Sequence, residues 1–586
     1  MTPSARHPGG AWLLERPAGI FTSEQATDEH RLIGKTAASF AESEVLPALG
    51  ALERKQWDVA RELLRRCGEL GLLGIHVPDA YGGVGLDTIS SLIVSDRIAR
   101  SASFAISFGA QANLAVLPIA LFGTDDQKAR YLPGLVSGER VGAYSLSEAG
   151  SGSDALSIRA RADRQPDGSF RLSGEKMWTT NGGFADVVVV FAKVDGEHFS
   201  AFIVERAFGG VSSPREEHKM GLEGSSTTPL VLENVPVPAS NLLGVEGRGH
   251  KLAFTVLNLG RLKLGAMCLG GCRYAIAESA RYASARRQFG QPIAAFGAIR
   301  HKLGEMTARA YALEALLYRT AHAIDEVAGA GHEPAALAAA LEEFAVEASI
   351  AKVAGSETLD FVLDENVQIH GGNGFVRDYP AERHYRDARV NRIFEGTNEI
   401  NRLLIPGMLA RRAAKGQLAL IPAALRLLDE LTGPPSAGTP VDAGPLGAEV
   451  LAVEAFKKVA ILGLGAAMQR FGATLADEQE VLLWLADIVI DTYGAESAVL
   501  RAVAAVAAGH RLADQHAAAA AVVVSEAALT IEASARRALS AIAEGDTLRT
   551  HLAGLRRLLK PSLRPIVPLR RSLADAAVAR GGYVFD

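Results

Sequence analysis

A β-rich segment between two long helical regions is the feature that most constrains the fold of this chain. Apolar residues recur every three or four positions from about Ser23 to Leu135, a spacing that predicts packed helices. Between residues 144 and 247 they form short runs instead, such as DVVVVFA at 186–192, separated by turns rich in Gly, Asp and Pro. This middle segment predicts a small antiparallel barrel or sandwich inside a mainly α-helical protein.

Helical spacing returns after the β-rich segment. It runs over 250–283, 296–327 and 334–363, long enough for an antiparallel four-helix bundle. A chain of 586 residues exceeds what one core organises, so about two to four units are expected. We predict an N-terminal helical domain over 1–140, a β-barrel domain over 141–247, a helical bundle over 248–430 and, after a Pro- and Gly-rich linker, a C-terminal helical extension over 446–586.

Composition excludes several classes of function. The net charge is −5 and no dense Lys/Arg block appears, which argues against nucleic-acid binding. Cys67, Cys268 and Cys272 form no disulfide framework and lack the partners of a zinc site, so we expect core thiols and no metal. No targeting segment and no stretch of about 18 apolar residues are evident. These features predict a cytoplasmic protein and give no support for membrane association.

One carboxylate, Glu395, is a candidate catalytic base. It lies in the segment RVNRIFEGTNEINR at 389–402, between the apolar pair Ile393-Phe394 and a Gly-Thr pair that precedes a predicted helix. Apolar neighbours exclude water and raise the proton affinity of a carboxyl group toward the range of a general base. Taken alone, a glutamate at a helix start is more often a capping or dipole partner. Other motifs in the chain must therefore decide between the two roles.

Five further motifs occur in a fixed order, and each has a simpler structural explanation as a loop, a core aromatic or a solvated arginine. They are YSLSEAGSGSD at 144–154, WTTNG at 178–182, NLGR at 258–261, RRQFGQP at 286–292 and QIHGGNGF at 368–375. Together with the Glu395 segment, this set resembles the acyl-CoA dehydrogenase flavoenzymes over residues 20–415. The C-terminal part, including LLWLAD at 482–487, is similar to the extension of the very-long-chain subgroup.

The resemblance implies FAD bound between the β domain and the bundle. The implied cofactor contacts within one chain are Tyr144, Leu146, Ser147, Gly152, Ser153, Trp178, Thr179, Thr180, Thr397, Asn398 and Glu399. A second set matches segments that reach the FAD of a neighbouring subunit and so implies a homo-oligomer, most simply a dimer: Arg286, Gln288, Phe289, Gln368, Ile369, Gly371 and Gly372. Positions matching contacts to acyl-CoA are Ser153, Asn258, Arg261 and Gly396.

The implied reaction is α,β-dehydrogenation of a long-chain acyl-CoA to a trans-2-enoyl-CoA in fatty acid β-oxidation, with electrons passed to an electron-transfer flavoprotein. Some relatives carry the base just before the arginine matched by Arg261, but Gly260 stands there, which leaves Glu395 as the base. In the helix matching the acyl tunnel, Ala105 leaves room, whereas Phe104 and Phe108 could close it. An acyl-CoA oxidase and a non-catalytic assembly protein that keeps the fold are the alternatives.

Overall fold

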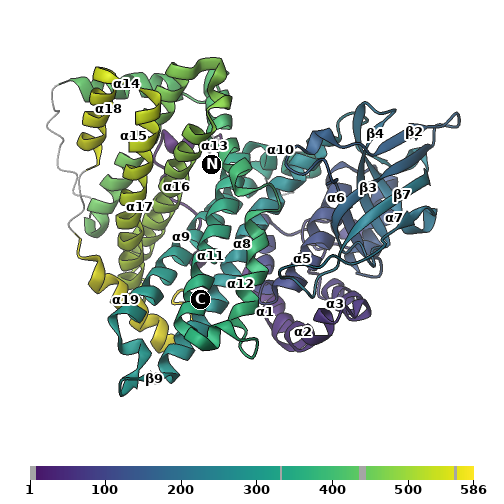
Figure 1. Cartoon of the computed structure of the whole chain (residues 1–586), viewed down its shortest axis with the longest axis horizontal. Helices are drawn as coiled ribbons and strands as arrows, with labels where there is room; N and C mark the ends of the chain where they lie inside the picture. Colours follow the sequence, from purple (N-terminus) through teal and green to yellow (C-terminus); the bar gives the residue numbers. More distant parts are fainter. Residues whose placement is uncertain (1–7, 330–332, 434–443, 560–563) are drawn as a thin grey trace.

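The computed structural model describes residues 8–329, 333–433, 444–559 and 564–586 (Figure 1). Polar side chains cap the N-terminal ends of several helices in the N-terminal region. At the start of α7, Thr124 Oγ1 accepts from Gln127 N at 3.2 Å and Gln127 Oε1 accepts from Thr124 N at 3.0 Å, a reciprocal cap that satisfies two end N–H groups. The helices are α1 (Asp28–Phe40), α2 (Leu46–Glu53), α3 (Trp57–Glu69), α4 (Thr88–Ile98), α5 (Ala102–Gly109), α6 (Leu117–Phe122) and α7 (Asp125–Val136).

The middle region is one mixed β-sheet, with strand order β6-β7-β3-β2-β4-β5-β8 and β1 paired to β4. Both β1 and β2 run parallel to β4, and the order is an open path in the described residues. The small β domain, predicted as an antiparallel barrel or sandwich, is present, but its pairing is mixed rather than wholly antiparallel, because local alternation does not specify which strand becomes a neighbour. The strands are β1 (Gly142–Ser145), β2 (Arg161–Arg164), β3 (Phe170–Thr180), β4 (Val187–Val194), β5 (His198–Glu205), β6 (Val211–Ser212), β7 (Thr227–Val237) and β8 (Leu242–Leu243).

A helical bundle follows the sheet. Two of its long helices, α8 and α11, pack along each other. They cross at glycines, since a Cβ on Gly355 would lie 2.8 Å from the Cα of Gly265. Such small residues allow close approach of the two backbones. The bundle helices are α8 (Gly249–Ala285), α9 (Gly297–Ala328), α10 (Pro334–Glu343), α11 (Ala345–His370), α12 (Ala381–Ala388) and α13 (Asn398–Ala414), with a hairpin of β9 (Arg287–Gln288) and β10 (Gln291–Pro292) between α8 and α9.

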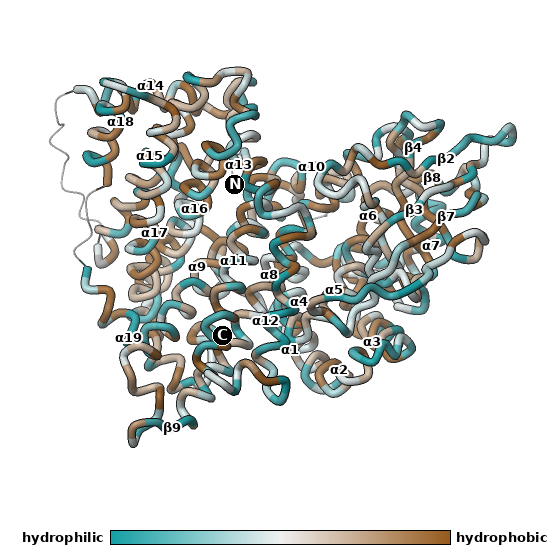
Figure 2. Tube along the Cα trace, viewed as in Figure 1, coloured by the Kyte–Doolittle hydropathy of each residue, from teal (hydrophilic) through white to brown (hydrophobic). Residues whose placement is uncertain are grey.

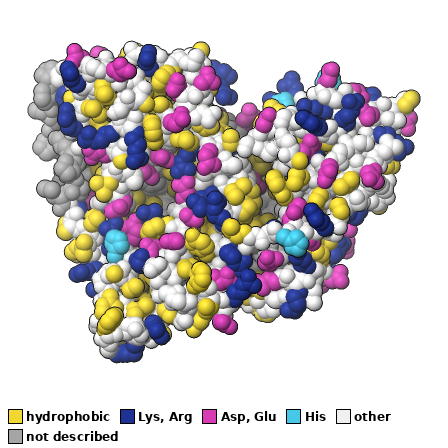
Figure 3. Space-filling view, viewed as in Figure 1, with side chains coloured by type: hydrophobic (Ala, Val, Ile, Leu, Met, Phe, Trp, Pro, Cys, Tyr) yellow, Lys and Arg dark blue, Asp and Glu magenta, His cyan; other side chains and the backbone are white. Residues whose placement is uncertain are grey.

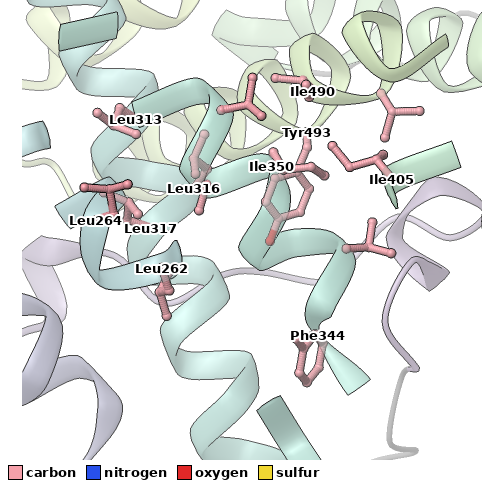
Figure 4. Packing of buried hydrophobic residues seen from close by; sticks show 14 of the residues in the cluster. Leu262, Leu264, Leu313, Leu316, Leu317, Phe344, Ile350, Ile405, Ile490 and Tyr493 are labelled. Carbon is pink, nitrogen blue, oxygen red and sulfur yellow. The ribbon is translucent and has the colours of Figure 1, made fainter. Parts of the chain in front are cut away.

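The C-terminal extension shares its core with the bundle. Helix α16 packs on α9 and α13, and α19 packs on α9. Figure 4 shows Ile490 and Tyr493 of α16 near Leu316 and Ile350 of the bundle, within one continuous set of buried residues. The extension is therefore seated on the bundle rather than tethered beside it. Helix α14 (Leu420–Thr432) precedes the extension, whose helices are α15 (Gly447–Phe471), α16 (Gln479–Ala507), α17 (Ala513–Ile542), α18 (Gly545–Leu558) and α19 (Ile566–Arg580).

Residues 8–27, here called the strap, pass between the bundle and the extension before α1 begins. Glu347 of α11 accepts hydrogen bonds from Gly10 N at 2.7 Å and from Trp12 Nε1 at 3.1 Å. The Trp12 ring also packs on Tyr493 of α16, with ring centroids 4.7 Å apart. The strap thus joins two helices that are far apart in sequence.

In the part of the chain that the structure describes, three helices are long and apolar enough to cross a membrane by length and composition alone, so the expectation of no such stretch is wrong. They span Ala102–Phe122, Gly249–Ala285 and Ala513–Ile542. Their most apolar windows are 78%, 83% and 50% buried inside the protein. Apolar and polar residues interleave along most of the chain (Figure 2), and the first two helices use their apolar surface mainly within the fold.

Candidate active site

Glu395 is held in a strained turn just before α13. Its φ is +58° and that of Gly396 is +79°; for a residue with a side chain this conformation costs roughly 1–2 kcal/mol. Asn401 compensates by donating from Nδ2 to the carbonyl oxygens of Gly396 at 2.8 Å and Thr397 at 3.0 Å. The hydroxyl of Thr397 also caps α13 by accepting from Ile400 N at 3.2 Å. The turn therefore fixes the direction in which the Glu395 side chain leaves the backbone.

One oxygen of the Glu395 carboxylate is buried without a hydrogen bond to any residue that the structure describes. The residue as a whole is half-buried, but Oε2 has no exposed surface and no partner in the described part of the chain. Burial raises the pKa of Glu395 to about 7, although the charges of Arg261 and Lys352 act in the opposite direction. The carboxylate is thus suited to accept a proton near neutral pH.

Two further features show that the space beside this carboxylate is shaped for a ligand. The hydroxyl of Tyr144 is buried and has no hydrogen-bond partner among the residues described, and burial together with the charge of Glu395 raises its pKa. On the facing helix α8, a Cβ on Gly260 would lie 2.9 Å from Glu395 Oε2. A larger residue at 260 would therefore occupy the place of the carboxylate. Buried polar atoms without partners are rare unless a ligand or water satisfies them.

Asn258 and Arg261 hold the turn from α8. Arg261 donates from Nε to the carbonyl oxygen of Glu395 at 3.2 Å and from Nη1 to Asn258 Oδ1 at 3.0 Å. Asn258 Nδ2 in turn donates to Leu341 O at 3.0 Å. Both side chains, which the resemblance relates to acyl-CoA, are buried. In this structure their observed contacts are with the protein, where they position the backbone of Glu395.

Lys352 of α11 and Asn401 are absent from the residues predicted from the sequence. Lys352 is fully buried, and its Nζ donates to Asn398 Oδ1 at 2.6 Å. Asn398 Nδ2 donates to Ser356 Oγ at 3.0 Å, so the Asn398 side chain joins α13 to α11 and is fully engaged within the protein. A lysine inside the apolar stretch SIAKVAG at 349–355 is the signal that could have revealed Lys352. Glu399, which follows Asn398 on α13, is exposed.

The predicted cofactor segment of the β domain lies across β3. Lys176 Nζ donates to Leu146 O at 3.0 Å and Met177 N donates to Ser147 O at 2.9 Å. Beyond these contacts Gly152 and Ser153 are exposed. The segment is therefore anchored at one end and exposed at the other, and Figure 3 shows a hollow between the β domain and the bundle.

Neighbouring residues of β3 point in different directions. Trp178 has φ +55° at an irregularity in the pairing with β7 and is 57% exposed, an unusual position for a tryptophan. Thr179 is buried and bonds Ser145, with 2.7 Å between the hydroxyl oxygens. Thr180 is half-buried beside it. Trp178 and Thr180 thus remain accessible to a ligand, whereas the side chain of Thr179 faces inward.

The second predicted cofactor set lies at the other end of α8. Arg286, Gln288 and Phe289 belong to the β9–β10 hairpin, where Phe289 is 91% exposed. The C-terminal end of α11 carries Gln368 and Ile369, and Gly371 and Gly372 follow it. This segment lies next to the end of α8, because Tyr282 OH donates to His370 O at 3.2 Å. At 1.5 Å per residue, Arg286 is about 37 Å from Arg261 along the helix, and Figure 1 shows β9 remote from the β domain. One chain does not bring the two sets together.

Family models match this chain in four segments. The acyl-CoA dehydrogenase N-terminal domain matches residues 27–139, the middle domain matches 143–235, and the C-terminal domain matches 247–409. A further model, also described as an acyl-CoA dehydrogenase C-terminal domain, matches residues 455–557. The expected fold class, a helical domain, a β domain and a helical bundle with added C-terminal helices, is confirmed.

Similar proteins agree with these matches. A probable acyl-CoA dehydrogenase of Bacillus subtilis is 45% identical over 97% of this chain and 96% of its own length. The human very long-chain specific acyl-CoA dehydrogenase is 36% identical over 69% of this chain and 64% of its own length. The crystal structure of an acyl-CoA dehydrogenase complexed with FAD from Bacillus anthracis has a TM-score of 0.95 at 44% identity and covers 98% of this chain and 99% of its own. The chain belongs to the acyl-CoA dehydrogenase family.

Proposed function

We propose that the protein is a FAD-dependent acyl-CoA dehydrogenase that converts a long-chain acyl-CoA to the trans-2-enoyl-CoA. The observation that carries the proposal is the buried carboxylate of Glu395, whose Oε2 has no partner in the described residues and whose pKa is raised to about 7. In this role Glu395 accepts the α-proton of the thioester. FAD, when bound, supplies the acceptor for the hydride that leaves the β-carbon.

The backbone beside Glu395 suits the carbonyl oxygen of a thioester. The N–H groups of Glu395 and Gly396 donate no hydrogen bond within the described residues. Successive residues with positive φ form a concave turn that can present such groups to an anion. Fixed donors at this place would stabilise the negative charge that develops when the α-proton is removed.

The residues of the β domain fit FAD. Gly150 and Gly152 have open space where a Cβ would stand, Trp178 offers a wide exposed face, and the Tyr144 hydroxyl lacks a partner among the described residues. Leu146, Ser147, Ser153, Thr180 and Thr397 to Glu399 would complete this side of the site. The strongly exposed Phe289 and the second set around it would contact the FAD of a second copy, so the proposed assembly is a homodimer.

A groove for the acyl chain follows one face of α8. Gly260, Leu264, Met267 and Gly271 are spaced at i, i+4, i+7 and i+11 and share that face. The last three line a cavity of about 50 Å³ together with Ala105 of α5. The face extends about 16 Å from Gly260 to Gly271, and the flexible side chain of Met267 lies at its middle. The cavity itself holds only a few methylene groups, so the proposed long acyl chain rests on the similarity to the human very long-chain specific acyl-CoA dehydrogenase.

The sequence left open whether Phe104 and Phe108 of α5 close the path of the acyl chain, and the residues that line the cavity bear on this question. Phe104 and Phe108 are buried in the core of the N-terminal and β regions, whereas Ala105 and Ile106 line the cavity. The small Ala105 therefore leaves room for the chain, and the two phenylalanines do not close it.

Narrowing this groove should change the chain-length preference. Ala105→Phe places a ring where the cavity lies, so we expect kcat/KM for palmitoyl-CoA to fall at least about tenfold, the cost of a few lost or blocked methylene contacts, while butyryl-CoA is less affected. Flavin reduction by acyl-CoAs from butyryl to stearoyl measures the effect. Ala80→Phe, at an exposed position outside the cavity, is the matched control. An unchanged preference in Ala105→Phe would contradict this path for the acyl chain.

The raised pKa of Glu395 predicts a pH dependence with a definite sign. Only the deprotonated carboxylate accepts a proton, so kcat/KM should rise with pH around an apparent pKa near 7. The free energy of unfolding should change in the opposite direction and fall as pH rises. Because burial raises the pKa above that of the unfolded chain, the folded protein binds more protons between about pH 4.5 and 7 and loses stability as pH rises through this window.

Thermal unfolding at pH 5.5 and pH 8 tests the predicted loss of stability with rising pH, with Glu395→Gln as the control that removes the titrating group. The variant should lose the part of the pH dependence that comes from residue 395. Identical pH profiles of stability in the two proteins would show that the carboxyl titrates normally.

The remaining parts of the proposal rest on family membership. Electrons would pass to an electron-transfer flavoprotein, as in fatty acid β-oxidation, and the protein would act in the cytoplasm. Exposure of the substrate-reduced enzyme to air separates a dehydrogenase from an oxidase. Slow reoxidation with little peroxide is expected, and rapid peroxide formation would assign the protein to the oxidases instead.

A further inference from the structure

A second cavity lies where the C-terminal extension meets the rest of the chain. Its volume is about 370 Å³, within the range of small-molecule sites. Its walls come from the strap, α1, α4, α8, α9, the corner between α16 and α17, α17 itself and the residues that follow α19. Arg273 on its wall follows Arg261 by about 18 Å along α8, and none of the groove residues Leu264, Met267 or Gly271 lines it. The cavity is therefore separate from the proposed acyl site.

The three carboxylates on its walls are already paired. Arg501 lies 2.6 Å from Glu24 and 2.7 Å from Glu314, and Arg273 lies 2.9 Å from Asp586. These buried ion pairs join the strap, α9, α16 and α8. They leave no unpaired negative charge among the described residues of the wall.

Two cations on the wall have no such partner. Lys35 of α1 and Arg511 of the α16–α17 corner line the cavity, and neither makes a hydrogen bond or ion pair with any residue that the structure describes. Arg31, which lies near Lys35, is paired with Asp28 at 2.8 Å. The cavity thus carries two positive charges that the protein does not balance.

A buried imidazole adds a hydrogen-bond donor. His516 is fully buried and lines the cavity, and its Nε2 has no partner among the described residues; Glu24 Oε1 is 3.7 Å away, beyond hydrogen-bond distance. Its Nδ1 lies 2.9 Å from Tyr311 OH. Burial raises the pKa of Tyr311 and lowers the pKa of His516 to about 4. The neutral ring carries one proton, and when the Tyr311 hydroxyl donates to Nδ1 that proton lies on Nε2.

We propose that this cavity binds a small phosphorylated metabolite whose phosphate group lies between Lys35, Arg511 and His516. A phosphate monoester carries a charge of about −1.5 to −2 at pH 7, which matches two unpaired cations, and its oxygens accept from Nε2–H. Since Lys35 belongs to the N-terminal region and Arg511 to the extension, the bound metabolite joins the two. Binding of a phosphorylated ligand is thus a role for the extension that the acyl-CoA reaction does not require.

Titration calorimetry of the full-length, flavin-loaded protein at low salt tests the proposal, with pyrophosphate and AMP as probes and citrate as a carboxylate comparison. Saturable binding of at least one phosphate probe is expected, weakened at least about tenfold in Lys35→Met/Arg511→Met, because each lost charge-assisted contact is worth roughly 1.5 kcal/mol or more. The matched control is Lys415→Met/Arg426→Met, which removes the same two residue types from exposed positions. It should bind as the unmodified protein does.

Three outcomes would overturn the proposal. The first is that neither phosphate probe shows saturable binding. The second is that the unmodified protein and Lys35→Met/Arg511→Met bind the probes equally well. The third is that citrate binds more tightly than both phosphate probes. Both lysine–arginine variants change exposed residues, so their thermal unfolding should match that of the unmodified protein. Flavin reduction by acyl-CoA reports separately on the proposed catalytic function and does not enter this test.

Discussion

Glutamine in place of Glu395 is expected to leave the fold and flavin binding intact and to lower turnover by about 10²- to 10⁴-fold, the usual contribution of a general base. The two side chains have nearly the same shape, and the backbone turn is held by Asn401 and Arg261 through carbonyl oxygens that the substitution does not change. Removing a buried carboxyl should not cost stability. Stopped-flow flavin reduction by palmitoyl-CoA measures the loss, and the flavin spectrum of the purified variant reports cofactor content.

Glu29 supplies the matched control. It is exposed and lies on the first turn of α1, so Glu29→Gln makes the same chemical change at a residue outside the proposed flavin and substrate site. We expect a small effect compared with that at position 395. Full activity of Glu395→Gln, with the flavin still bound, would mean that another group removes the proton.

A methyl group at position 260 is expected to lower activity without lowering stability. Gly260→Ala would put a Cβ 2.9 Å from Glu395 Oε2 and 3.4 Å from its Cδ, so the carboxylate must move. A displacement of about 1 Å at a reacting group can cost 10²-fold in rate. Alanine also favours a helix over glycine by about 0.5–1 kcal/mol, which should offset the cost of moving the end of a flexible side chain. Parallel measurement of kcat/KM and thermal unfolding separates the two effects.

Gly407→Ala is the control for this substitution. Gly407 lies inside helix α13 with open space where a Cβ would stand, so the same change should gain helix stability and leave kcat/KM unchanged. If Gly260→Ala matched Gly407→Ala in activity, the Glu395 carboxylate would not depend on the space that residue 260 provides.

Much of the fold follows from local patterns in the sequence. The apolar run at 186–192 lies within β4 (Val187–Val194), and the helical spacing at 296–327 matches α9 (Gly297–Ala328). Helical spacing at 334–363 is broken in the structure at Phe344, between α10 and α11. The parallel pairing of β1 with β4 and the shared core of bundle and extension depend on contacts between distant segments, which no local period encodes.

The same limit applies to the active site. Glu395 could be predicted because its apolar neighbours and the following Gly-Thr pair are adjacent in sequence. The contacts around Glu395 could not be predicted from this segment, because Gly260 and Arg261 come from α8 and Lys352 from α11. Asn258 and Arg261 were expected at the substrate, yet their observed hydrogen bonds are to Leu341, to Glu395 and to each other. Motif matching identifies such residues but not the atoms they contact.

Hydrogen exchange at the α-carbon of the substrate tests the central claim most directly. With palmitoyl-CoA in D₂O under anaerobic conditions, the unmodified enzyme should place deuterium at the α-carbon of recovered acyl-CoA, as detected by mass spectrometry, and Glu395→Gln should place almost none. Equal deuterium incorporation by both proteins would contradict the assignment of Glu395 as the group that removes the α-proton.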